Sequence, residues 1–103
     1  MTRQFELAGK SGARYRYSAL QEDRFLPPAG ANFVIAQVTA EGAKVVYVGE
    51  TDNLASQAWR IALDKARVAY AGATVLTRLN VTRAVREAER VDLIEEYQPP
   101  LNR

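Results

Sequence analysis

In the stretch Val45-Val46-Tyr47-Val48-Gly49-Glu50-Thr51-Asp52-Asn53-Leu54, a β-branched and aromatic run passes directly into a helix start. The run favours a strand, and Gly49 lets the backbone turn from strand to helix. Thr51 or Asp52 can cap a helix that we expect to continue to about Tyr70, with Gly72 just past its end. One face of this predicted helix is apolar and consists of Leu54, Ala58, Ile61, Ala62, Ala66 and Ala69.

Two predicted hairpins precede this helix. Residues 32–39 are apolar and β-branched, and the turn Glu41-Gly42-Ala43 connects them to the strand at residues 45–48. Residues 3–20 form a further predicted hairpin, with the turn Gly9-Lys10-Ser11-Gly12. Its apolar positions alternate with polar ones and are Phe5, Leu7, Tyr15 and Tyr17.

The remaining chain predicts one strand and one helix. Residues 74–81 alternate as a strand, and Asn80 or Thr82 can cap a last helix that ends near Tyr97, before Pro99-Pro100. The apolar stripe of that helix is Ala84, Ala88, Val91 and Ile94. The order ββ, ββ, α, β, α predicts an α+β fold, with helices packed on a small, mainly antiparallel sheet. We expect one compact unit, with residues 1–29 as an N-terminal hairpin extension and residues 30–103 as the main domain.

Composition excludes several kinds of chemistry. The chain has 103 residues, enough for one small domain, and contains no cysteine and no histidine. Disulfides, Cys- or His-ligated metals and a Ser-His-Asp triad are therefore excluded. A net charge of +2 permits nucleic-acid binding without arguing for it. No apolar run approaches the roughly 20 residues of a membrane span, and the polar N-terminus is unlike a secretory signal. We expect a cytoplasmic protein that does not bind membranes.

Two segments carry a resemblance to a known family. The run from Tyr47 to Leu54 is followed, on the last helix, by Leu93-Ile94-x-x-Tyr97-x-Pro99-Pro100-x-Asn102. Together they resemble the GIY-YIG nuclease superfamily, over about residues 30–102. The first hairpin lies outside this resemblance, and short bacterial proteins of this kind also have a leading hairpin. The resemblance implies hydrolysis of DNA phosphodiesters with one divalent metal ion, Mg²⁺ or Mn²⁺.

Three of the family's functional positions hold unexpected residues. Phe33 stands where the resemblance implies a tyrosine that helps to activate water, and it has no hydroxyl group. Gln57 stands at the position of the catalytic arginine, although Arg60 follows one turn later. Arg90 replaces the metal-binding glutamate, and an arginine cannot ligate Mg²⁺. We assign no metal ligand, and the adjacent Glu89 is a weak candidate; Glu50 and Asp52 are other nearby carboxylates.

Two family positions are retained. Tyr47 can either touch water or phosphate, or pack with one structural hydrogen bond. Asn102 matches the terminal asparagine that helps to order the family's site. We therefore assign no catalytic residue and expect no cofactor, with Mg²⁺ required only if the domain cuts.

The last helix also carries a basic stripe. Arg83, Arg86 and Arg90 lie at i, i+3 and i+7, where they could hold a phosphate backbone. They could equally pair with Glu87 and Glu89 on an ordinary exposed face.

We therefore expect a GIY-YIG-like domain with an eroded active site that binds DNA or RNA without cutting. The predicted binding residues are Tyr47, Gln57, Arg60, Arg83, Arg86 and Arg90. Two alternatives are an active metal-dependent DNA endonuclease and a protein-interaction or regulatory domain. The first reading predicts that Phe33 and Tyr47 lie on adjacent antiparallel strands, with Gln57 and Arg90 converging beside them from two helices.

Overall fold

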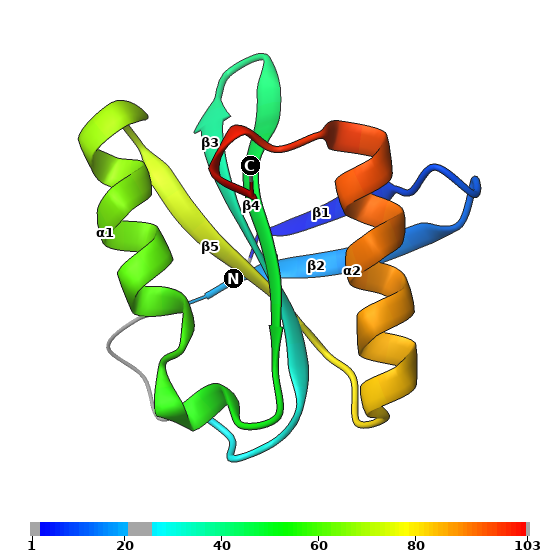
Figure 1. Cartoon of the computed structure of the whole chain (residues 1–103). Helices are drawn as coiled ribbons and strands as arrows, with labels where there is room; N and C mark the ends of the chain where they lie inside the picture. Colours follow the sequence, from blue (N-terminus) through cyan, green and yellow to red (C-terminus); the bar gives the residue numbers. More distant parts are fainter. Residues whose placement is uncertain (1–2, 21–25, 103) are drawn as a thin grey trace.

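A single antiparallel sheet organises the chain (Figure 1). The computed structural model describes residues 3–20 and 26–102. Within these residues, five strands lie in the order β1-β2-β5-β3-β4. Their bounds are Gln4–Ala8 (β1), Arg14–Ala19 (β2), Ala31–Thr39 (β3), Gly42–Thr51 (β4) and Ala73–Leu79 (β5). Two helices, α1 (Trp59–Ala69) and α2 (Arg83–Tyr97), pack on this sheet, so the α+β prediction is confirmed.

Both predicted hairpins are present. β1 pairs with β2 and β3 with β4, and the glycines in the two turns adopt positive φ angles, +91° at Gly12 and +136° at Gly42. The first hairpin continues the same sheet, because Ser18 and Ala19 pair with β5. Residues 1–2 and 21–25 of the predicted extension lie outside the described residues.

A β-bulge interrupts the pairing of β3 with β4. Ile35 pairs with Tyr47 and Ala36 pairs with Val45, which leaves Val46 as the extra residue. A bulge of this kind re-aims the side chains around it. As a result Val46 and Tyr47 both pack on the same hydrophobic cluster.

The two helices cover opposite faces of the sheet. Side chains of β3 alternate: Phe33 and Ile35 pack with Leu63 of α1, whereas Val34 packs with Leu93 of α2. Strand β4 is the edge strand between the two helices, as Figure 1 shows. Two short 3₁₀ helices complete the fold, η1 (Leu54–Ser56) before α1 and η2 (Pro100–Asn102) after α2.

The prediction of one continuous helix from residue 51 or 52 to residue 70 is wrong. Asn53, rather than Thr51 or Asp52, caps η1 by accepting a hydrogen bond from the Ala55 N–H, and Gln57 then adopts a left-handed conformation at φ +59°. The helix α1 starts only at Trp59, which shifts the phase of the pattern. The buried residues are Leu54, Trp59, Leu63 and Ala66, and the predicted core residue Ile61 is 72% exposed.

The prediction that the apolar stripe of α2 forms its buried face is wrong. Ala84, Ala88 and Val91 are exposed, and only Ile94 is half-buried. The buried residues of α2 are Arg86, Glu89 and Leu93. Arg86 and Glu89 can face the sheet because they pair there with polar side chains of the strands, Glu50 on β4 for Arg86, and Tyr17 on β2 and Arg78 on β5 for Glu89. Within the described residues, neither helix is long and apolar enough to span a membrane.

Candidate functional site

The centre of the candidate site is Tyr47 on the edge strand β4. Its ring stacks on Phe33, with ring centroids 6.0 Å apart and an interplanar angle of 23°. The prediction that these residues lie on adjacent antiparallel strands is confirmed. Gly49 makes this arrangement feasible, because a Cβ atom there would lie 2.5 Å from Cζ of Phe33. The prediction that Gly49 turns the backbone from strand to helix is wrong, because Gly49 lies inside β4. Its role is to admit the Phe33 ring.

A cavity opens beside Tyr47 on the α1 side. Its volume is about 280 Å³, and it is lined by Tyr47, Ala58, Ile61, Ala62, Lys65 and Leu101. The apolar lining comes from α1, the residue before it and η2, while Lys65 and Tyr47 contribute an ammonium and a hydroxyl group. Sequence reasoning missed Lys65, because its position depends on where α1 begins.

Asn102 covers part of the exposed edge of β4. Its Oδ1 accepts from the Val48 N–H at 2.8 Å, and its Nδ2 donates to the Val48 carbonyl at 2.9 Å. The amide group thus replaces a neighbouring strand at one residue of the edge. It also holds η2 in place, so that Leu101 forms one wall of the cavity.

Arg90 lies on the other side of β4, on α2. Its guanidinium donates to the exposed Glu87 carboxylate, and its side chain is 32% exposed. The hydrogen bond to Glu87 raises the pKa of Arg90. Arg90 lies on the α2 side of the sheet, whereas the Tyr47 ring packs in the cluster on the α1 side.

Gln57 and Arg90 do not converge as predicted. Gln57 lies in the turn before α1, where its Oε1 accepts from Nε of Arg60 at 3.0 Å. The guanidinium of Arg60 also stacks over the Trp59 ring, 4.6 Å from its centroid. Because α1 and α2 cover opposite faces, the two family positions approach β4 from opposite sides. The single cleft that the resemblance implies is divided by the edge strand.

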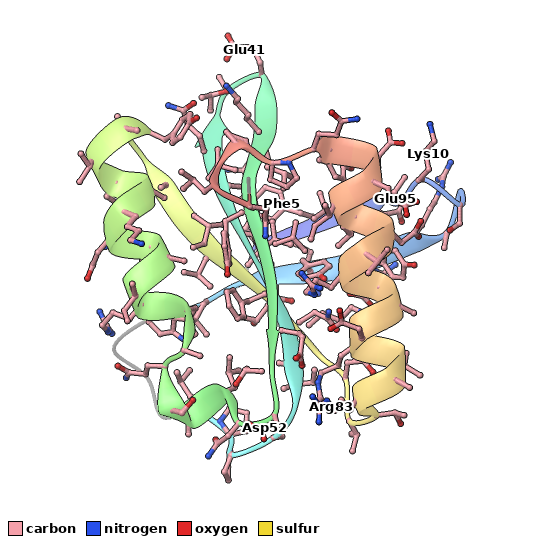
Figure 2. The ribbon with its side chains drawn as sticks, in the orientation of Figure 1. Phe5, Lys10, Glu41, Asp52, Arg83 and Glu95 are labelled. Atoms are coloured by element: carbon pink, nitrogen blue, oxygen red, sulfur yellow. The ribbon has the colours of Figure 1, made fainter. Side chains whose placement is uncertain are left out.

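The predicted arginine stripe on α2 is also broken. Arg86 is buried, donates to Glu50 at 2.8 Å and donates to the main-chain carbonyls of Asn80 and Val81. Arg83 is exposed and lies with Asp52 beside a depression of about 300 Å³. Figure 2 labels both residues, with Arg83 at the start of α2. The stripe is thus one buried and two accessible arginines. Of the ion pairs we weighed, Glu87–Arg90 is present, whereas Glu89 pairs with Arg78 and not with Arg86.

Glu89, the weak metal candidate, belongs to a buried polar network. It accepts from the hydroxyl of Tyr17 and from Nε of Arg78 at 3.2 Å, and more weakly from Asn80 at 3.4 Å. Burial, followed by the charge of Glu89, raises the pKa of the fully buried Tyr17 well above its ordinary value. Asn32 extends the network by accepting from Asn80.

The residues present do not fit a divalent cation. Both oxygens of Glu89 already accept hydrogen bonds from protein groups, and the next residue, Arg90, is a cation that would repel a metal ion. Among the described residues, no three acidic side chains are grouped closely enough to hold a metal.

Comparisons with protein-family models, with curated proteins and with solved structures find no match to this chain.

Proposed function

We propose that this domain binds the phosphate backbone of nucleic acid at the edge of β4 and does not cut it. The observation that carries the proposal is the position of the edge strand β4 between two helices that each present a cation. Lys65 of α1 lines a cavity with Tyr47 on one side of this strand, and Arg90 of α2 lies on the other side. A phosphate chain crossing the edge strand can contact both cations and the Tyr47 hydroxyl.

Arg90 can exchange its present partner for a phosphate at low cost. Its partner Glu87 is an exposed carboxylate, and exposed ion pairs contribute little to stability. A guanidinium also binds two phosphate oxygens at once with its planar fork. The neighbouring Glu50 does not cancel this charge, because it is paired with the buried Arg86.

The same residues argue against cleavage. Phe33 is buried and has no hydroxyl to exchange a proton, and Gln57 brings no charge to a phosphate. Loss of one charge-stabilising donor typically lowers turnover by about 10²–10³-fold. With Arg90 at the metal position, we expect no cleavage of plasmid or duplex DNA in Mg²⁺, and an active endonuclease is the disfavoured alternative.

Fluorescence anisotropy with labelled DNA and RNA oligonucleotides tests the proposal. We expect binding that survives a chelator and weakens steeply with salt. Arg90→Ala and Lys65→Ala should each weaken binding by about 1–3 kcal/mol, the scale of a charge-assisted hydrogen bond. Arg14→Ala is the matched control, because Arg14 is exposed and lies on β2, away from the β4 edge. Equal losses in all three variants, or no binding by the parent protein, would refute the proposal.

A second candidate function, binding of a basic protein segment, is favoured by a different surface. A shallow groove between the first hairpin turn and α2 is lined by apolar Tyr15, Ala84, Ala88 and Val91. The charged residues of its lining are all acidic, namely Glu87, Asp92 and Glu95. Figure 2 shows Glu95 on the part of α2 that faces the turn at Lys10. Apolar contacts inside an acidic rim suit an amphipathic helix with lysine or arginine along its edges.

Calorimetric titration with a synthetic amphipathic peptide of leucine and lysine tests this second function. Ala88→Arg should abolish binding, because it puts a bulky cation into the groove. Ala55→Arg is the control, since Ala55 is exposed on η1. If the peptide binds Ala88→Arg as tightly as the parent, this groove is not a docking surface.

A further inference from the structure

The cavity beside Tyr47 has a shape that a phosphate contact alone does not require. Its volume of about 280 Å³ lies just below the range of about 300–1,000 Å³ typical of small-molecule pockets. Four of its lining residues, Ala58, Ile61, Ala62 and Leu101, are aliphatic. A phosphate group would gain nothing from these walls, whereas the flat face of a nucleobase would.

The polar groups of the cavity suit a nucleotide. The Tyr47 ring is held in position by its stacking on Phe33, and its hydroxyl group can donate to a base or a phosphate oxygen. Lys65 places an ammonium group in the lining, where it can hold the attached phosphate. The first turn of α1 carries no acidic residue that would repel this phosphate.

The exposure of Ile61 points to the same kind of ligand. Ile61 is 72% exposed although it lines the cavity. A base inserted between Ile61 and Tyr47 would cover this apolar surface on one face and stack on an aromatic ring on the other. Bases in a duplex are paired and stacked, so they cannot enter such a cavity without being flipped out.

From these observations we infer that the cavity takes one unpaired nucleobase, which makes single-stranded nucleic acid the preferred ligand of the β4 edge. The inference rests on the proposed phosphate-binding function. Lys65 and Arg90 hold the backbone, and the cavity between α1 and Tyr47 distinguishes a strand with free bases from a duplex.

The test compares three labelled probes by fluorescence anisotropy. They are an oligothymidylate of about 12 nucleotides, within the usual site size of single-strand binders, an abasic oligomer of equal length and a duplex of that length. The abasic oligomer keeps every phosphate and lacks the bases. We expect the parent protein to bind the oligothymidylate about tenfold more tightly than the abasic oligomer, as one stacked base would give. The duplex should bind no more tightly than the abasic oligomer.

Two variants fill the cavity. Ala62→Trp places an indole inside it, and Ala58→Trp does so from an exposed position, where the substitution is compatible with folding. Both should reduce the ratio of the two affinities to about one. The control is Ala69→Trp, which adds the same side chain at an exposed position of α1 outside the cavity lining.

The outcomes separate this inference from the function on which it rests. Equal affinity of the parent for oligothymidylate and abasic oligomer overturns the base pocket and leaves phosphate binding standing. A ratio that persists in both cavity-filling variants also overturns it. Failure of the parent to bind any of the three probes refutes the proposed function, and the inference with it.

Discussion

Replacement of Glu89 by alanine tests whether this buried carboxylate is structural or a remnant of a metal site. Its side chain is 2% exposed and accepts hydrogen bonds from Tyr17 and Arg78. In Glu89→Ala, the hydroxyl of the fully buried Tyr17 loses its acceptor, whereas Arg78 is 38% exposed and regains water. We therefore expect most of the loss to come from Tyr17.

The magnitude follows from these contacts. An unpaired buried hydroxyl costs about 1–3 kcal/mol, and the one methylene that Glu89→Ala removes adds roughly 0.8 kcal/mol. The sum, about 2–4 kcal/mol, overlaps the usual cost of about 3–5 kcal/mol for breaking a buried ion pair. For a domain of this size, a loss of about 3 kcal/mol lowers the melting temperature by about 12–24 °C.

The assay is thermal and urea unfolding followed by circular dichroism, with and without Mg²⁺. Glu87→Ala is the control, because it removes an exposed carboxylate two residues away on the same helix. We expect it to melt close to the parent. Mg²⁺ should leave every melting temperature unchanged, since a ligand stabilises only the protein that binds it.

Two results would refute this reasoning. One is a Glu89→Ala variant that melts within a few degrees of Glu87→Ala. The other is a Mg²⁺-dependent rise in the melting temperature of the parent that is absent in Glu89→Ala, which would identify Glu89 as a metal ligand.

Three further predictions concern single residues. Burial raises the pKa of Tyr15 to about 12 and that of Tyr17 further, from an ordinary 10.0, so the folded state holds these two protons more tightly. In urea titrations at increasing pH, the free energy of unfolding should therefore fall above pH of about 10, and it should fall less steeply in Tyr17→Phe. Asn102→Ala leaves the N–H and carbonyl of Val48 without their side-chain partner, so we expect the free energy of unfolding to fall by about 1–2 kcal/mol and aggregation, measured by light scattering, to increase. Unchanged values of both would mean that η2 does not protect the edge of β4. Gln57→Gly removes the strain of a left-handed backbone at φ +59°, so it should raise the free energy of unfolding by up to about 1 kcal/mol. A clear decrease would show that the Gln57–Arg60 hydrogen bond contributes more to stability than the backbone strain costs.

The hairpins were predictable because their signals are local. Alternating side chains mark the strands, and Gly12 and Gly42 supply the positive φ angles at the turns. The position of Phe33 and Tyr47 on adjacent strands also followed from the sequence, since both residues belong to one hairpin, whereas the stacking of their rings was not predicted. The bulge at Val46 did not, because it depends on packing against both faces.

The helices were harder to predict for two reasons. The break at Gln57 involves neither glycine nor proline, so the sequence gives no sign of a left-handed residue there. In α2, charged residues replace the apolar ones expected on the buried face, and their partners are remote in sequence. Arg86 binds Glu50, 36 residues away, and Glu89 binds Tyr17, 72 residues away.

One signal of the buried network was nevertheless present in the sequence. Asn32 begins an otherwise apolar run on a central strand, and a buried amide requires partners. Its Nδ2 donates to the main-chain carbonyl of Arg86, which fixes α2 on the sheet. An asparagine at such a position therefore indicated that a polar element packs above it.

The most direct test of phosphate binding at the β4 edge is the salt dependence of oligonucleotide affinity in the parent, Arg90→Ala and Glu87→Gln. Each phosphate contact contributes a slope of about −0.7 for single strands. The account predicts that Arg90→Ala makes the slope shallower by about one contact, while Glu87→Gln, which frees Arg90 from its partner, tightens binding. Parallel slopes for the parent and Arg90→Ala, with no gain in affinity from Glu87→Gln, would contradict it.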